Sequence, residues 1–243
     1  MGGAPALLSR ARAAGLVALL AGLAGWEALA GSLPDVRNAW DVALVAGLLI
    51  PATFAAVWLA LPLAAARGLL PVALAFVALA VALELAGAGA LFNVAKLAAL
   101  ALLGFWFLEL FQALSWVVAV AVLVPWVDAI SVWRGPTEYV VSEQPGLFDR
   151  ISIAFQIPGE QSSANLGPPD VLFFALFLAT AARFALRPGW TWLGMTGLLA
   201  LTLVLTASLD VAGLPALPAV CVGFLLPNAD LLWRRRRAGE RAA

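Results

Sequence analysis

The stretch "LSWVVAVAVLVPWVDAISVW", residues 114–133, contains a single charged residue, Asp128. A helix needs about 20 predominantly apolar residues to cross the hydrocarbon core of a bilayer. An acidic side chain in the middle of such a helix costs about 2.5–3.5 kcal/mol on insertion scales. The stretch therefore predicts a membrane-spanning helix, and the buried carboxylate calls for a functional or structural role.

The composition of the whole chain is that of a polytopic membrane protein. It is 64% hydrophobic and 12% charged, with a mean hydropathy of +1.00, whereas soluble domains are about 45–50% apolar and about 25% charged. The sequence has no histidine, which excludes a Ser-His-Asp triad and a histidine zinc site within this chain. The zero net charge gives no indication of nucleic acid as a partner, and we expect no metal or cofactor. Cys221 lies in an apolar run and is interpreted as packing.

We expect an all-α fold with about eight membrane-spanning helices. The segments are 13–30, 40–63, 69–91, 94–111, 114–133, 170–186, 190–209 and 214–233. The only long polar segment, 134–169, separates the fifth from the sixth. The chain is thus predicted to have two parts: residues 1–112 with four spans, and residues 113–243 with four spans and the long loop.

Arginine placement predicts the orientation in the membrane. Basic residues favour the cytoplasmic side, and eight spans put most of them on one side: Arg10, Arg12, Arg67, Arg183, Arg187 and Arg234 to Arg237. Both termini are therefore predicted to be cytoplasmic, with the 134–169 loop facing outward. The bias of the basic residues toward arginine suggests a GC-rich bacterial genome, and hence the bacterial cytoplasmic membrane. A cleaved secretory signal is the alternative for the first span, because "ALAG" at 28–31 resembles a cleavage site.

Asp128 and Asp170 stand out among the acidic residues because helix-breaking residues precede both. "VLVPWV" comes before Asp128 and "NLGPP" before Asp170, and irregular backbone at membrane depth is tolerated around a water-filled cavity. The last span adds "GLPALPAV" at 213–220, whose two prolines remove amide donors. In the outward loop, "ISIAFQI" at 151–157 alternates apolar and polar residues, which predicts a short strand or hairpin.

In this order, these motifs resemble those of the presenilin and signal peptide peptidase family of intramembrane aspartyl proteases. That family has Tyr-Asp on one helix, Gly-x-Gly-Asp at the start of the next and Pro-Ala-Leu near the start of the last helix. At the corresponding places this chain reads 127–128 "VD", 167–170 "GPPD" and 215–217 "PAL". The resemblance implies a presenilin-like arrangement with Asp128 and Asp170 as the catalytic pair. It also implies that substrate is bound by Gly167, Pro215, Ala216, Leu217, Ile153 and Phe155.

The implied activity is hydrolysis of peptide bonds in single-span membrane substrates or remnant signal peptides, without a cofactor. The expected partners are a transmembrane substrate and membrane lipid, and the sequence does not indicate an oligomeric state. A catalytically inactive homologue is one alternative, favoured by Pro169 at the place of the family's second glycine. A proton- or ion-coupled transporter is the other, because broken helices and intramembrane carboxylates also mark transport sites.

Overall fold

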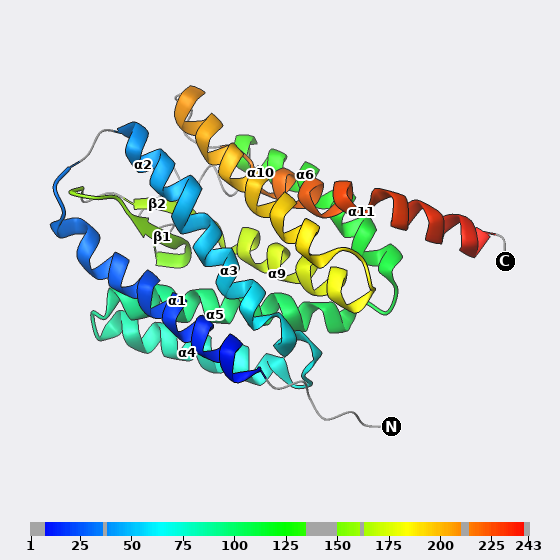
Figure 1. Cartoon of the computed structure of the whole chain (residues 1–243), viewed down its shortest axis with the longest axis horizontal. Coiled ribbons are helices and arrows are strands. Elements are labelled where there is room, and N and C mark those ends of the chain that lie inside the picture. Colours follow the sequence, from blue (N-terminus) through cyan, green and yellow to red (C-terminus); the bar gives the residue numbers. More distant parts are fainter. Residues whose placement is uncertain (1–7, 36–37, 135–149, 161–162, 210–213, 241–243) are drawn as a thin grey trace.

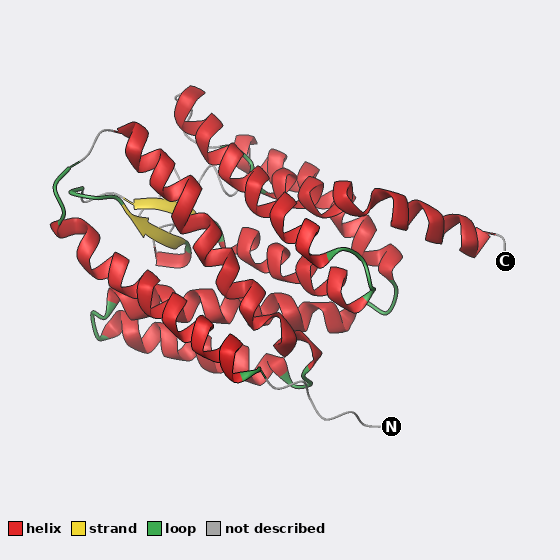
Figure 2. Cartoon of the chain, in the orientation of Figure 1, coloured by secondary structure: helices red, strands yellow, loops and turns green. Residues whose placement is uncertain are grey.

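The computed structural model describes residues 8–35, 38–134, 150–160, 163–209 and 214–240, and these are mostly helical (Figures 1 and 2). The long helices are α1 (Arg10–Leu29), α4 (Leu69–Leu85), α5 (Gly89–Phe107), α6 (Leu114–Arg134), α9 (Pro168–Arg183), α10 (Pro188–Leu209) and α11 (Leu217–Glu240). Between α1 and α4, α2 (Asn38–Leu44) continues through a π-helical turn, Val45–Leu49, into α3 (Ile50–Ala60). Short 3-10 turns follow α1, α3 and α5 at Ala30–Ser32, Leu61–Ala65 and Leu108–Leu110.

Helices occupy all eight segments that the sequence predicts to be apolar spans. Five helices of the described chain are long and apolar enough to cross a membrane: Arg10–Ser32, Ala39–Ala65, Gly89–Leu110, Leu114–Val132 and Pro188–Leu209. Helix α4 is apolar but shorter, α9 has 16 residues, and α11 ends in a run of arginines. The structure therefore supports integration into a membrane through several helices, and the total of eight spans stays a prediction.

Helix α9 lies at the centre of the molecule and packs against α5, α10 and α11 (Figure 1). Its aromatic side chains stack on two neighbouring helices: Phe174 on Phe54 of α3, with ring centroids 3.8 Å apart, and Phe177 on Phe224 of α11, at 4.8 Å. A glycine in α5, Gly104, allows a close approach, because a Cβ atom there would come 2.7 Å from the Cβ of Ala175. Helix α9 is thus held firmly from several sides.

The predicted strand is confirmed and is part of a hairpin. Strand β1 (Ile153–Gln156) pairs antiparallel with β2 (Ser163–Leu166), with Ile153 opposite Leu166. Strand β2 runs almost directly into α9. The sequence did not single out β2, whose "SANL" lacks the β-branched and aromatic residues typical of strands.

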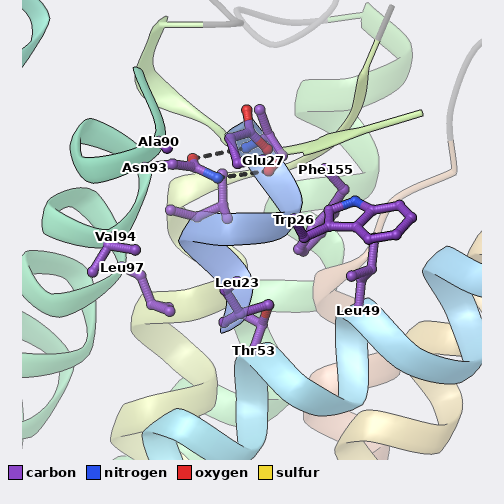
Figure 3. Close-up of a pocket in the computed structure, with 12 residues that line it drawn as sticks. Leu23, Trp26, Glu27, Leu49, Thr53, Ala90, Asn93, Val94, Leu97 and Phe155 are labelled. Carbon is purple, nitrogen blue, oxygen red and sulfur yellow. Dashed lines mark hydrogen bonds between the residues drawn. The ribbon is translucent and has the colours of Figure 1, made fainter. Parts of the chain in front are cut away.

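Side chains of α1 and α5 cover the other edge of β1 (Figure 3). The Asn93 amide donates to the Ala154 carbonyl at 2.6 Å and accepts from the Ala154 N–H at 3.0 Å. The Trp26 indole donates to the Gln156 carbonyl at 3.1 Å, and Glu27 accepts from the Gln156 N–H. Because α1 makes these contacts and packs on α3 and α5, it is an integral helix of the fold.

The turns of the bundle lie at two opposite ends. Figure 1 shows the N-terminal end of α1, the α9–α10 turn and the C-terminal end of α11 on one side, and the hairpin and α4–α5 turn on the other. Arginines that the sequence predicts to be cytoplasmic lie at the first of these ends: Arg10 begins α1, Arg183 ends α9, and Arg234 lies in the C-terminal part of α11.

Candidate functional site

Asp170 lies in the first turn of the central helix and is 8% exposed. Gly167 is the N-cap residue, and the two prolines that follow occupy the first helical positions, where their missing N–H groups would have no intrahelical partner in any case. The Asp170 carboxylate accepts a hydrogen bond from the Gly167 N–H at 3.1 Å. The backbone before Asp170 is therefore a regular helix start, and Pro169 fits it.

Asp128 lies on α6, which stays helical through Pro125. The expectation of broken backbone before Asp128 is wrong, since a single proline in a long helix removes only one hydrogen bond and can be accommodated by a kink. The Asp128 side chain is half-buried, and its Oδ2 accepts from the backbone N–H of Leu217 at 3.0 Å. Leu217 is the first residue of α11, so this carboxylate meets the N-terminal end of that helix.

The two carboxylates come from different helices and lie close enough for their charges to interact. Helices α6, α9 and α11 pack against one another around them. The Cys221 thiol, one turn along α11 from Leu217, interacts electrostatically with both aspartates and is 1% exposed. Cys221 follows Leu217 by four residues, and residues i and i+4 share a helix face. This spacing was the sequence signal that Cys221 lies on the face of α11 that contacts Asp128.

The Pro-Ala-Leu segment forms the beginning of α11. Pro215 and Ala216 precede the helix and are half-buried, and Leu217 is buried. The Ala216 carbonyl accepts from the N–H groups of Ala219 and Val220 at 3.0 and 3.3 Å. The resemblance implies substrate binding by this segment, but the Ala216 carbonyl is engaged in the first turn of α11 and the Leu217 N–H is engaged by Asp128.

Ile153 and Phe155 point into the core. They are 1% and 5% exposed and line an internal cavity of about 20 Å³ together with Trp26 and Asn93 (Figure 3). This burial argues against direct contact of the two side chains with a substrate. Alternation alone indicated that one face of the strand is buried, but it could not tell which surface covers that face.

Two residues that position the hairpin, Asn93 and Lys96, were not among the site residues expected from sequence. Lys96 is buried in α5, and its ammonium group donates to the carbonyls of Arg150 and Ser152 and lies 4.2 Å from the centre of the Phe92 ring. A lysine and an asparagine three residues apart in an apolar helix share one face. That spacing was the available signal for a polar docking surface within the bundle.

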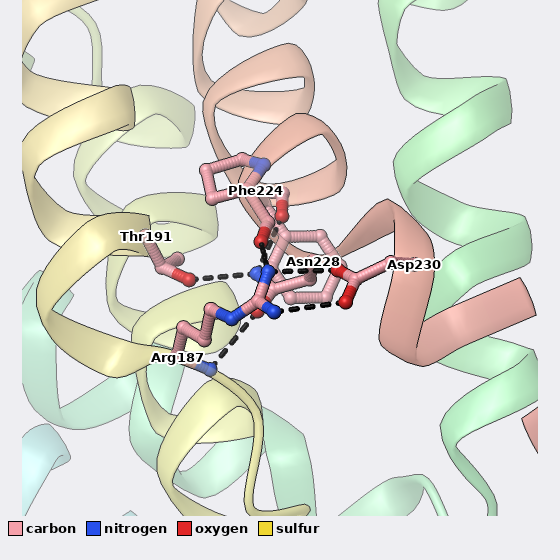
Figure 4. A network of polar contacts seen from close by, with 6 residues as sticks. Arg187, Thr191, Phe224, Asn228 and Asp230 are labelled. Carbon is pink, nitrogen blue, oxygen red and sulfur yellow. Dashed lines mark hydrogen bonds and ion pairs between the residues drawn. The ribbon is translucent and has the colours of Figure 1, made fainter. Parts of the chain in front are cut away.

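The other acids of the predicted spans have separate surroundings. Glu84 pairs with Arg150 at 3.4 Å. Glu84 precedes the 19-residue helix α5, whereas Glu109 follows that helix. The length of α5, about 28 Å, therefore separates the two acids along the helix axis, and they do not pair with each other. Asp230 binds Arg187 in the network of Figure 4, and Asp210 lies outside the described residues.

No protein-family model matches this sequence, and a comparison with curated proteins finds no match.

Proposed function

We propose that this chain is an intramembrane aspartyl protease that cuts single-span membrane substrates or remnant signal peptides through Asp128 and Asp170. The observation that supports the proposal most is that the two carboxylates, which belong to separate helices, interact electrostatically, while Asp128 accepts from the N–H of Leu217 in the Pro-Ala-Leu segment. A buried acid with a purely structural role is usually paired with a cation. Asp128 and Asp170 instead influence each other, which is the arrangement of a catalytic dyad.

The electrostatics suit a pair that shares one proton. Two neighbouring carboxylates do not readily ionise together, so in this proposal they share one proton and one negative charge remains. Asp170 lies in the first turn of α9, and Asp128 contacts the first residue of α11. Helix N-termini carry partial positive charge and stabilise an anion. Two of them thus support the single charge of this dyad.

Such a dyad hydrolyses a peptide bond with water as the nucleophile. The ionised carboxylate takes a proton from water while the water oxygen attacks the scissile carbonyl carbon, and the protonated carboxyl group polarises the carbonyl oxygen. The tetrahedral intermediate then collapses. The C–N bond breaks, and the proton returns to the departing amine. Each carboxyl group ends in its starting state, without a covalent intermediate.

The helix lengths support a site below the outer membrane surface. Asp170 precedes Arg183 by 13 residues, a rise of about 20 Å along the helix. With Arg183 at the cytoplasmic boundary of a core about 30 Å thick, Asp170 lies about 10 Å below the outward boundary. In this proposal both termini are cytoplasmic, all eight segments cross the bacterial membrane, and the hairpin faces outward.

Strand addition offers a way to hold the substrate, because a helical segment must unwind before its peptide bonds can be attacked. The outer edge of β1 is occupied by Asn93, Trp26 and Glu27, so in our proposal the unwound substrate pairs along β2. Strand β2 leads through Gly167 to Asp170, which would deliver a paired substrate to the dyad. This differs from the expectation from sequence, which assigned the substrate strand to the segment of Ile153 and Phe155.

The test is a cleavage assay with purified protein and a labelled single-span peptide. We expect products from the parent protein and from Glu109→Gln, an exposed acid outside the site, and only a small residual rate from Asp128→Asn or Asp170→Asn. A transition-state isostere should suppress cleavage. Peptide binding without cleavage by the parent would support the inactive homologue. Undiminished cleavage by either asparagine variant would refute the dyad.

A further inference from the structure

The arginine-rich end of the bundle contains a groove. Figure 4 shows the polar network beside it, which includes Arg187, Asn228 and Asp230. The groove has a volume of about 330 Å³ and is lined by Arg187, Trp190, Leu226 and Pro227. Trp190 is 64% exposed and Leu226 is 70% exposed. The groove thus combines one cationic group with an apolar wall that faces outward from the bundle.

The polar network fixes the position of the Arg187 guanidinium. Its Nη1 donates to the Pro227 carbonyl and to Asp230 Oδ1, both at 2.7 Å, and its Nη2 donates to Asp230 Oδ2 at 2.8 Å. Asn228 accepts from the Arg187 backbone N–H at 2.9 Å and donates to the Thr191 hydroxyl at 2.8 Å. The side chain is held before any ligand arrives, which reduces the ordering cost of binding.

Asp230 and Pro227 use only part of this guanidinium. Arginine has five N–H donors, and the contacts among the described residues use two on Nη1 and one on Nη2. The Nε–H and the second Nη2–H remain, and they form the other planar fork of the group. Such a fork matches two oxygens of a phosphate.

The surrounding charge favours an anion at this end. Arg183 and Arg234 to Arg237 are exposed there, and Arg235 donates to the Ala185 carbonyl in the turn before α10. The Arg237 guanidinium lies 5.0 Å from the centre of the Trp233 ring, and Trp233 is 54% exposed. Exposed tryptophans beside arginines are typical of the membrane interface.

We infer that the groove of Arg187, Trp190, Leu226 and Pro227 binds an anionic phospholipid. The lipid phosphate takes the second fork of Arg187, and the glycerol and acyl chain lie against Trp190 and Leu226. Basic pockets between helices on the cytoplasmic side of a membrane are suited to anionic headgroups. A lipid accounts for the apolar wall, which a free phosphate ion would not contact. The inference is independent of the proposed dyad.

The experiment measures lipid bound to the full-length protein by native mass spectrometry, with phosphatidylglycerol and phosphatidylcholine at equal concentration. We expect one preferred phosphatidylglycerol, and about fivefold weaker binding in Arg187→Gln, which corresponds to the loss of one basic contact at a membrane surface. Trp190→Ala, an exposed position, should also weaken binding. Arg67→Gln, the same charge change outside the groove, should leave it unchanged.

Two further arms distinguish a lipid site from a site for a free anion. Asp230→Asn removes the negative charge beside the phosphate position but keeps an amide oxygen that can accept from the Arg187 guanidinium, and the Pro227 carbonyl still holds Nη1. We therefore expect phosphatidylglycerol to bind at least as tightly as in the parent, and weaker binding would contradict the inference. Inorganic phosphate in large excess should not displace the lipid, because it gains nothing from Trp190 and Leu226. Displacement by phosphate, equal binding of phosphatidylcholine, or unchanged binding in both Arg187→Gln and Trp190→Ala would overturn it.

Discussion

Replacing Asn93 by alanine tests whether side chains of the helical bundle hold the hairpin in place. Asn93 makes two hydrogen bonds to one residue of β1, at 2.6 and 3.0 Å to the Ala154 carbonyl and N–H. A typical intramolecular hydrogen bond contributes about 0.5–1.5 kcal/mol net, so removal of both should destabilise the hairpin by about 1–3 kcal/mol. The substitution leaves the contacts of Trp26 and Glu27 in place.

The assay is amide hydrogen exchange of the protein in detergent, read at Ala154 and at Gln156. A loss of about 1–3 kcal/mol corresponds to exchange about five to about 150 times faster for an amide that opens locally. We expect this acceleration at Ala154 and a smaller one at Gln156, whose N–H is bound by Glu27. Thr202→Val is the matched control, because it removes only a bond to the Leu198 carbonyl within α10. Unchanged exchange at Ala154 in Asn93→Ala would refute the reasoning.

Two other predictions concern the helices that carry the site. Gly104→Ala should lower the stability of the fold by about 1–3 kcal/mol through overpacking against Ala175, measured by thermal unfolding. Gly197→Ala, with no neighbour within 4 Å of its added Cβ, should be neutral or stabilise by up to about 1 kcal/mol. Equal melting shifts would contradict this. Leu217→Pro removes the N–H that donates to the Asp128 carboxylate and should slow cleavage about tenfold to a hundredfold. Leu217→Ala keeps that N–H and should remain active, so comparable rates in the two variants would count against a role for the N–H.

The helices were predictable because each depends on a local run of apolar residues. A helix appears in every one of the eight segments that hydropathy indicates, including α9 and α11, which both contribute to the candidate site. Their boundaries were harder to place. Proline was interpreted as a break before Asp170, but at the first positions of a helix it is compatible with regular structure.

Contacts between distant segments were less accessible from sequence. The proximity of Asp128 and Asp170 was expected only from the resemblance to a family, since neither local pattern indicates where the partner lies. The coverage of β1 by Asn93 and Trp26 depends on how α1 and α5 pack. Strand periodicity identifies a buried face but carries no information on what occupies the hydrogen-bonding edge. For this reason the predicted substrate strand and the proposed one differ.

The most direct test of the central claim is a double-mutant cycle on the initial rate of peptide cleavage. The four proteins are the parent, Asp128→Asn, Asp170→Asn and the double variant. If the carboxylates act as one unit, each single variant loses as much activity as the double variant, because either substitution already removes the unit. Losses that add on a free-energy scale, or a single variant that cuts at the parent rate, would contradict joint activation of water by these two residues.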